Sequence, residues 1–189
     1  DGEPNRKYNE NWGYLNGEEY SYTRNYYHKP VMSLNWDYKI TDETKLSTVV
    51  YASFGRGGGT GTVGSTSAIE AYRLADGSIN FDRIYQFNKA NNSAALARRS
   101  SINSHNWIGA ISSLNHKLND NLNFTVGVDG RYYKGLHYRV MSDFLGATSY
   151  KDNTDINNPN RIITDAYDAS PNWNPFGGKT DETKIMYNN

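Results

Sequence analysis

The sequence predicts an all-β fold, a segment of an antiparallel up-and-down β-barrel with about four strands in two hairpins. Three features support this prediction. Apolar and polar residues alternate in four segments, the hairpin turns are about four residues or fewer, and the connections between hairpins run to tens of residues. A period of two indicates β-strands, because successive side chains of a strand point to opposite faces.

The first hairpin is expected to join strands at about residues 31–40 and 45–55. Its apolar face is expected to hold Met32, Leu34, Trp36, Tyr38 and Ile40 on the first strand and Leu46, Thr48, Val50, Ala52 and Phe54 on the second. Pro30 precedes the first strand, where its missing N–H does least harm. The turn at residues 41–44 contains Asp and Thr, whose side chains can bond the local backbone.

The second hairpin is expected to join strands at about residues 105–118 and 122–134 through a hinge at residues 119–121. Its apolar face holds Ile108, Ala110, Leu114, Leu122, Phe124, Val126 and Val128. Asp129 and Arg131 lie on the polar face. Both hairpins therefore have one apolar and one polar side.

Long external loops are predicted for the rest of the chain, at residues 1–29, 56–103 and 135–183. A helical turn is expected near Gly17 to Arg24. Asn80 is placed to cap a short helix, and Ser93 to cap a second turn through Arg99. A fifth strand is expected to begin between Lys184 and Tyr187.

Composition narrows the class of protein. The chain has 20 Lys and Arg against 20 Asp and Glu, so no net charge favours nucleic acid as a partner. The absence of cysteine excludes disulfides, thiol nucleophiles and Cys-ligated metals. No apolar run approaches the roughly 18 residues of a membrane helix, which excludes a helical membrane protein. The weak alternation of a transmembrane β-barrel is still compatible with this composition.

Strand length and loop asymmetry favour a barrel in the bacterial outer membrane. Crossing tilted hydrocarbon takes about 9 to 11 residues per strand, and outer-membrane barrels have short periplasmic turns and long external loops. Aromatic girdles are expected near strand ends, at Trp36, Tyr38, Trp107 and Tyr132. Four strands cannot close a barrel, so this chain would be part of a larger one. The alternative is a secreted carbohydrate-binding or adhesive β-sandwich, which also alternates apolar and polar residues.

Five stretches resemble the barrel region of SusC/RagA-like TonB-dependent outer-membrane transporters. They are Asn11–Tyr20, Tyr26–Pro30, Tyr51–Gly61, Asn103–Trp107 and Gly127–Tyr133. The resemblance implies a barrel of about 22 strands with outer-membrane lipid around it. It also implies a plug that engages TonB, a SusD-like lipoprotein lid, and uptake of a glycan or peptide. No plug domain and no TonB box are seen in the sequence, so the resemblance implies a mid-barrel fragment.

Several short motifs resemble those of enzymes, cofactor sites or metal sites, but each lacks residues or elements that such a site needs. Residues 59–64 match G-x-G-x-x-G, but no parallel crossover follows, so a flexible external loop is expected there instead of a dinucleotide site. Asn153, Asp155 and Asn157 alternate as in a calcium loop, yet Thr164 stands where the bidentate acid is needed. The histidines and serines lack catalytic spacing. No enzyme activity, cofactor or metal is predicted.

Six residues are candidates for contact with substrate or lid: Trp12, Tyr14, Trp173, Phe176, Asp129 and Arg131. The aromatic residues are expected in external loops, where such rings stack on sugars or anchor partner proteins. Their alternative role is packing of the loops against one another. Asp129 and Arg131 are expected to face the lumen, and their alternative role is cross-strand pairing or contact with the plug.

Overall fold

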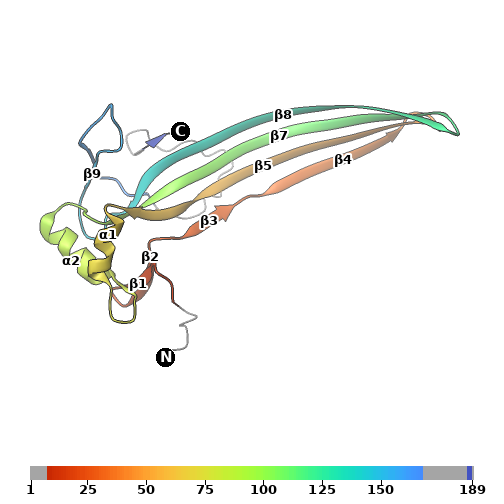
Figure 1. The fold of residues 1–189 in the computed structure, drawn as a ribbon. Coiled ribbons are helices and arrows are strands. Elements are labelled where there is room, and N and C mark those ends of the chain that lie inside the picture. The colour runs from red at the N-terminus through yellow and green to blue at the C-terminus, as the bar shows by residue number, and fades with distance from the viewer. Residues whose placement is uncertain (1–7, 168–186, 189) are drawn as a thin grey trace.

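The computed structural model describes residues 8–167 and 187–188, which form a mostly antiparallel β structure, as predicted. The main feature is a long curved sheet with the order β11-β8-β7-β5-β3, in which β4 also pairs with β5 (Figure 1). Its strands are β3 (Asn25–His28), β4 (Val31–Lys39), β5 (Thr44–Val63), β7 (Ala97–Asn119), β8 (Leu122–Asp143) and β11 (Tyr187–Asn188). Both tight turns lie at one end of this sheet, and the helices lie at the other.

The two hairpins form as predicted, but three strands are longer than expected. β5 extends to Val63, β7 begins at Ala97 and β8 continues to Asp143, so the predicted loops at 56–103 and 135–183 are partly strand. The expected flexible loop at residues 59–64 is wrong up to Val63, because Gly58 to Val63 pair with Ala97 to Ile102 of β7. These pairs join residues far apart in sequence, so local glycine content does not reveal them.

Strand register joins the predicted apolar positions of both hairpins into one surface, here called the apolar face. Leu34 pairs with Val50, Val50 with Ala110, and Ala110 with Gly130. The next rows on this face are Trp36–Thr48–Ser112–Val128 and Tyr38–Leu46–Leu114–Val126. Large side chains here are exposed, including Leu34 at 70% and Val128 at 68%. The opposite side of the sheet, here called the polar face, carries Asp129 and Arg131.

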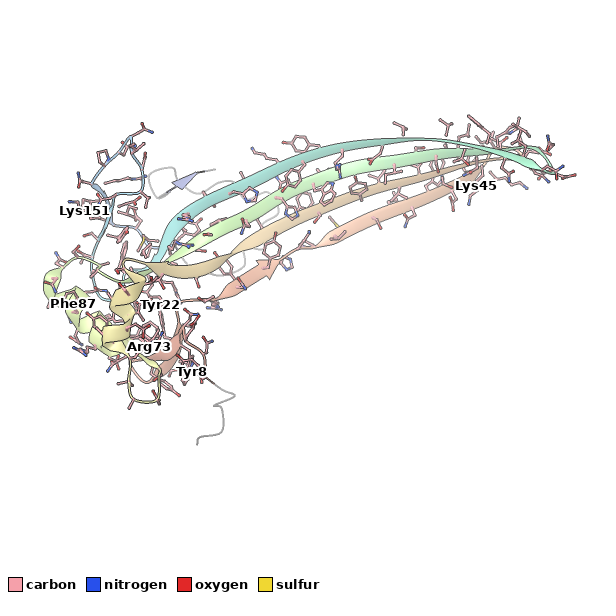
Figure 2. The ribbon with its side chains drawn as sticks, in the orientation of Figure 1. Tyr8, Tyr22, Lys45, Arg73, Phe87 and Lys151 are labelled. Atoms are coloured by element: carbon pink, nitrogen blue, oxygen red, sulfur yellow. The ribbon has the colours of Figure 1, made fainter. Side chains whose placement is uncertain are left out.

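A compact head lies at the end of the sheet opposite the tight turns (Figure 1). It contains β1 (Trp12–Leu15), β2 (Glu18–Ser21), β6 (Ile79–Asn80), α1 (Thr66–Ile69), the 3₁₀ turn Glu70–Tyr72 and α2 (Phe81–Asn91). Its core holds Tyr22, Ile69, Ile79, Phe81, Ile84, Leu96 and Leu145. Figure 2 shows Tyr22 within the head and Lys45 at the far end of the sheet. A short hairpin, β9 (Tyr150–Asp152) with β10 (Arg161–Ile163), lies near the head.

The expectation that residues 1–29 form a loop with a helical turn near Gly17 to Arg24 is wrong. β1 and β2 form an antiparallel hairpin there, with a turn at Asn16 and Gly17, both at positive φ. Gly17 adopts this conformation without strain because it has no Cβ. β3 then pairs with β5. The hairpin is stable in this place because Leu15, Tyr20 and Tyr22 pack against the helical core.

The predicted helix after Asn80 is confirmed, and its cap explains where it starts. The Asn80 side chain accepts a hydrogen bond from the N–H of Arg83 at 2.9 Å. The second turn expected from Ser93 is wrong, because the chain enters β7 at Ala97. The first residues of β7 form ladder hydrogen bonds with both β5 and β8, and these outnumber the bonds that a single helical turn would form. None of the helices in the described residues is long and apolar enough to cross a membrane.

Asn88 of α2 ties the head to the strand ends. Its side chain is fully buried, and Nδ2 lies within bonding distance of the carbonyl oxygens of Leu96, Phe144 and Leu145 at 2.8, 3.2 and 3.0 Å. Its Oδ1 accepts from the N–H of Ala95 at 3.0 Å. Loop carbonyls that would otherwise be buried without partners are thereby satisfied. The head and the long sheet are therefore joined by a specific polar contact as well as by packing.

Candidate functional site

Five aromatic side chains gather on the polar face, midway along the long sheet. This set, here called the aromatic patch, consists of Tyr27 on β3, Tyr51 on β5, His105 and Trp107 on β7, and Tyr133 on β8. Trp107 pairs with Ser53 on one side and Tyr133 on the other, which brings the rings of separate strands together. An aromatic surface on the hydrophilic side of an amphipathic sheet is the main candidate site of this chain.

The rings of the aromatic patch contact one another in sequence. His105 stacks on Tyr133 with centroids 6.0 Å apart, and Trp107 meets Tyr133 edge to face at 6.2 Å. Tyr51 meets Trp107 edge to face, also at 6.2 Å. The hydroxyl of Tyr27 lies 3.5 Å from Nδ1 of His105. Such contacts hold the rings in place, which lowers the entropy cost of binding a ligand against them.

Glycines beneath the rings let three of them lie against the wall of the sheet. Gly57, Gly55 and Gly109 are the sites where an added Cβ would collide with Tyr27, His105 and Tyr51 respectively. The cross-strand pairs Tyr27–Gly57, Gly55–His105 and Tyr51–Gly109 place each ring directly beside its glycine. Tyr27 and Tyr133 are about half exposed, whereas His105 is only 8% exposed beneath Tyr133, so the accessible π surface of the patch comes mainly from the tyrosines.

The polar-face candidates Asp129 and Arg131 are exposed, and Arg131 belongs to the edge of the aromatic patch. The guanidinium of Arg131 lies 5.5 Å from the centroid of the Trp107 ring, a cation–π contact. Asp129 lies one row away, opposite Ile111. Within the part of the chain that the structure describes, neither residue forms an ion pair. The alternative role of cross-strand ion pairing is therefore not observed.

The aromatic candidates of the N-terminal region lie in the head and not in a loop. Trp12 and Tyr14 are on β1, with ring centroids 4.9 Å apart in an edge-to-face contact. Their three-stranded sheet is separate from the long sheet, so they are not part of the aromatic patch. Trp173 and Phe176 lie outside the described residues. Among the candidates that the structure describes, Arg131 is the one in contact with the patch.

Sequence reasoning missed the aromatic patch, although one signal for it was present. Tyr51, Trp107 and Tyr133 occupy polar-face positions of their strands, where most residues are small or polar, such as Ser, Asn, Lys and Asp. The girdle position expected for Trp107 follows from its place near the end of a shorter predicted strand. In the full-length β7 it is central and on the polar face. An aromatic residue out of phase with an apolar stripe was the signal to follow.

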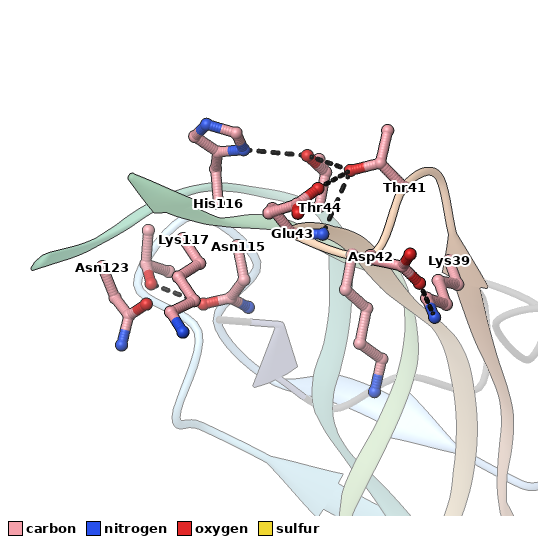
Figure 3. Close-up of a pocket in the computed structure, with 11 residues that line it drawn as sticks. Lys39, Thr41, Asp42, Glu43, Thr44, Asn115, His116, Lys117 and Asn123 are labelled. Atoms are coloured by element: carbon pink, nitrogen blue, oxygen red, sulfur yellow. Dashed lines mark hydrogen bonds and ion pairs between the residues drawn. The ribbon is translucent and has the colours of Figure 1, made fainter. Parts of the chain in front are cut away.

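An open hollow of about 690 Å³ lies at the end of the sheet away from the head, between the two tight turns (Figure 3). Thr44 Oγ1 lies 2.8 Å from Nδ1 of His116, and the carbonyl of Glu43 accepts from the N–H of Lys117 at 2.8 Å. The ion pair of Lys117 with Asp120 closes one turn at 2.7 Å. These contacts hold the two hairpins against each other, and the charged groups here are largely satisfied among themselves.

No protein-family model, curated protein or solved structure gives a significant match to this chain. In residues 8–167 and 187–188, no three His, Asp or Glu side chains are grouped so that they could hold a metal ion. The two faces of the sheet and the aromatic patch are therefore the features that bear on function.

Proposed function

We propose that this chain forms part of the wall of a TonB-dependent active importer of the bacterial outer membrane. The observation that carries the proposal is the exposed apolar face of a single-layer sheet whose other face is polar. Soluble monomers rarely expose contiguous apolar patches larger than a few hundred Å². Along β8 the apolar face runs from Leu122 to Tyr132, which suits the roughly 9 to 11 residues of a membrane-crossing strand.

The two ends of the sheet differ in the way expected of a strand pair that crosses the outer membrane. Both tight turns lie at one end of the sheet and the head at the other, as expected for a periplasmic and an external side (Figure 1). Trp36 and Tyr38 stack at 5.7 Å near the turn end of the apolar face, where they would form part of an aromatic girdle. In this orientation the polar face, with its aromatic patch, lines the lumen.

The proposed mechanism follows from these two faces and from the resemblance to SusC/RagA-like transporters. The head and the lumen wall would contact a glycan or peptide, with a SusD-like lipoprotein as the lid. TonB, acting on a plug supplied by the rest of the importer, would open the lumen. This chain would supply wall and external surface, and the aromatic patch would offer ring faces to the passing substrate.

Arginine substitutions in the full importer test the topology. Leu34→Arg and Val126→Arg place a charge on the lipid side and are expected to cost about 2 to 4 kcal/mol of folding free energy near the bilayer midplane. Asn35→Arg, next to Leu34 but on the lumen side, is the matched control and should cost much less. Folding is measured by urea titration in lipid vesicles. Equal tolerance at all three positions would reject the assignment of the faces.

Expression of residues 1–189 alone separates this proposal from a secreted β-sandwich. A wall segment should aggregate unless detergent and the rest of the barrel are present, because its apolar face and strand edges are uncovered. A soluble monomer that melts cooperatively would support the sandwich instead.

A further inference from the structure

Charge is distributed unevenly along the chain, although the whole chain has equal numbers of acidic and basic residues. The five strands β3, β4, β5, β7 and β8 contain nine Lys and Arg but only three Asp and Glu. The basic residues are Lys39, Lys45, Arg56, Arg98, Arg99, Lys117, Arg131, Lys134 and Arg139, and the acidic ones are Asp37, Asp129 and Asp143. β5 and β7 have no acidic residue at all. The wall is therefore basic, and 17 of the 20 acidic residues lie outside these five strands.

Several of these cations line the polar face on both sides of the aromatic patch. Arg131 lies over Trp107 at one side, and Arg99 and Arg139 lie on the polar face toward the head. Lys29 and His137 also lie near His105. Within the described residues, Lys29, Arg99 and Arg131 form no ion pair. Arg99 and Arg139 are close enough to repel each other.

The polar-face cations between Arg131 and Arg99 span a length that suits an oligosaccharide. Arg131 is opposite Gly109 of β7, and ten residues separate Gly109 from Arg99. At about 3.3 Å per residue the row is roughly 33 Å long, with the aromatic rings beside it. Cations along a water-facing surface favour a ligand of opposite charge. Ring faces between the cations suit the flat apolar faces of sugar rings.

We propose that the polar face binds an anionic saccharide, with Lys29, Arg99 and Arg131 contacting its carboxylate or sulfate groups and the aromatic patch stacking on its rings. This inference rests on the proposed function and narrows its substrate class. Guanidinium groups pair with carboxylate and sulfate oxygens through two parallel hydrogen bonds. Arg99 and Arg131 are therefore expected to contribute more to binding of the anionic groups than Lys29 does.

The test measures binding of three hexasaccharides to the full importer in detergent by calorimetry. One is neutral, one carries uronic carboxylates and one carries sulfates. At least one charged probe is expected to bind about tenfold or more tightly than the neutral one, with an affinity that falls as salt is added. Which charged probe binds better separates carboxylate from sulfate as the natural group.

Substitutions locate the binding. Arg99→Gln and Arg131→Gln should each weaken the charged probe about tenfold or more and leave the neutral probe nearly unchanged. Lys134→Gln is the matched control, since Lys134 is on β8 like Arg131 but on the opposite face. Arg131→Lys should bind the charged probe more tightly than Arg131→Gln does, because it keeps the positive charge. Circular dichroism of each variant establishes that it is folded.

Two results would overturn the inference without touching the proposed function. One is a membrane-inserted importer that binds the neutral probe as tightly as the charged ones. The other is equal binding by the Arg variants and the Lys134→Gln control. Failure of the chain to occupy a barrel wall, seen as equal tolerance of arginine on both faces, would reject the proposed function itself.

Discussion

Tyr51 on β5 lies across Gly109 of β7, its directly paired residue, so that any Cβ at Gly109 would collide with the phenol ring. The same relationship joins His105 to Gly55 and Tyr27 to Gly57. Each ring belongs to a different strand from its glycine. The orientation of the aromatic patch is thus set by pairs of residues that only strand pairing brings together.

Gly109→Ala is expected to push the Tyr51 ring away from the wall. Overpacking of this kind costs about 1 to 3 kcal/mol, and it should also move Tyr51 relative to Trp107. The matched control is Gly130→Ala on the neighbouring strand, where an added Cβ has no atom within 4 Å. Denaturant titration of the full protein measures the cost, and tryptophan fluorescence reports on the ring contact. Similar losses for both variants would contradict the assigned role of Gly109.

Asn88→Ala is expected to loosen the head from the strand ends. The change leaves the carbonyl groups of Leu96, Phe144 and Leu145 without this partner in a buried site, at a cost of at least about 3 kcal/mol. Asn91→Ala on the same helix serves as control, because Asn91 is exposed and its side chain bonds only the Phe87 carbonyl. Hydrogen exchange at the Ala95 amide should accelerate strongly in the first variant and hardly in the second.

The head is expected to lose stability in alkaline solution. Burial, followed by the negative charge of Asp143, raises the pKa of Tyr20 above its ordinary value of 10.0, and burial also raises the pKa of Tyr22. A pKa that is higher in the folded state stabilises the fold at pH values below 10. That contribution is lost as the pH rises toward the folded pKa, because the unfolded chain releases the proton more readily.

Near-ultraviolet circular dichroism against pH, together with tyrosinate absorbance, measures this effect. Tyr20→Phe should move the alkaline transition to higher pH, while losing the 3.0 Å hydrogen bond from Tyr20 to Asp143 and so some stability at neutral pH. Tyr14→Phe, on the exposed side of β1, should leave the transition where it is. A transition unaffected by Tyr20→Phe would show that another group controls alkaline unfolding.

Much of the long sheet could be predicted from local pattern. The alternation that placed Leu34, Val50 and Val126 together on one face is confirmed by the register of all four strands. A one-residue slip would move every side chain to the other face, so the pattern fixes register strongly. Asn80 likewise marked the start of α2, since an N-cap acts within one helical turn.

The candidate site was less accessible to such reasoning. Arg131 was identified, whereas Tyr51, Trp107 and Tyr133 were not, because their significance depends on neighbours in other strands. The glycines at residues 57–59 indicated a loop by composition alone. In the structure they form strand, because partner backbones supply ladder bonds. The space that a side chain would occupy is taken by the Tyr27 ring at Gly57, by the Ser101 carbonyl at Gly58 and by the Asn25 side chain at Gly59.

The sequence by itself determined which residues face which side of the sheet, where the tight turns fall and where the main helix begins, since these depend on side chains a few positions apart. Only the tertiary structure decided how far β5, β7 and β8 extend, that residues 12–28 join as strands, and that five rings meet on the polar face. These features depend on contacts between distant segments, and such contacts form only when the paired strands and the packed head stabilise one another.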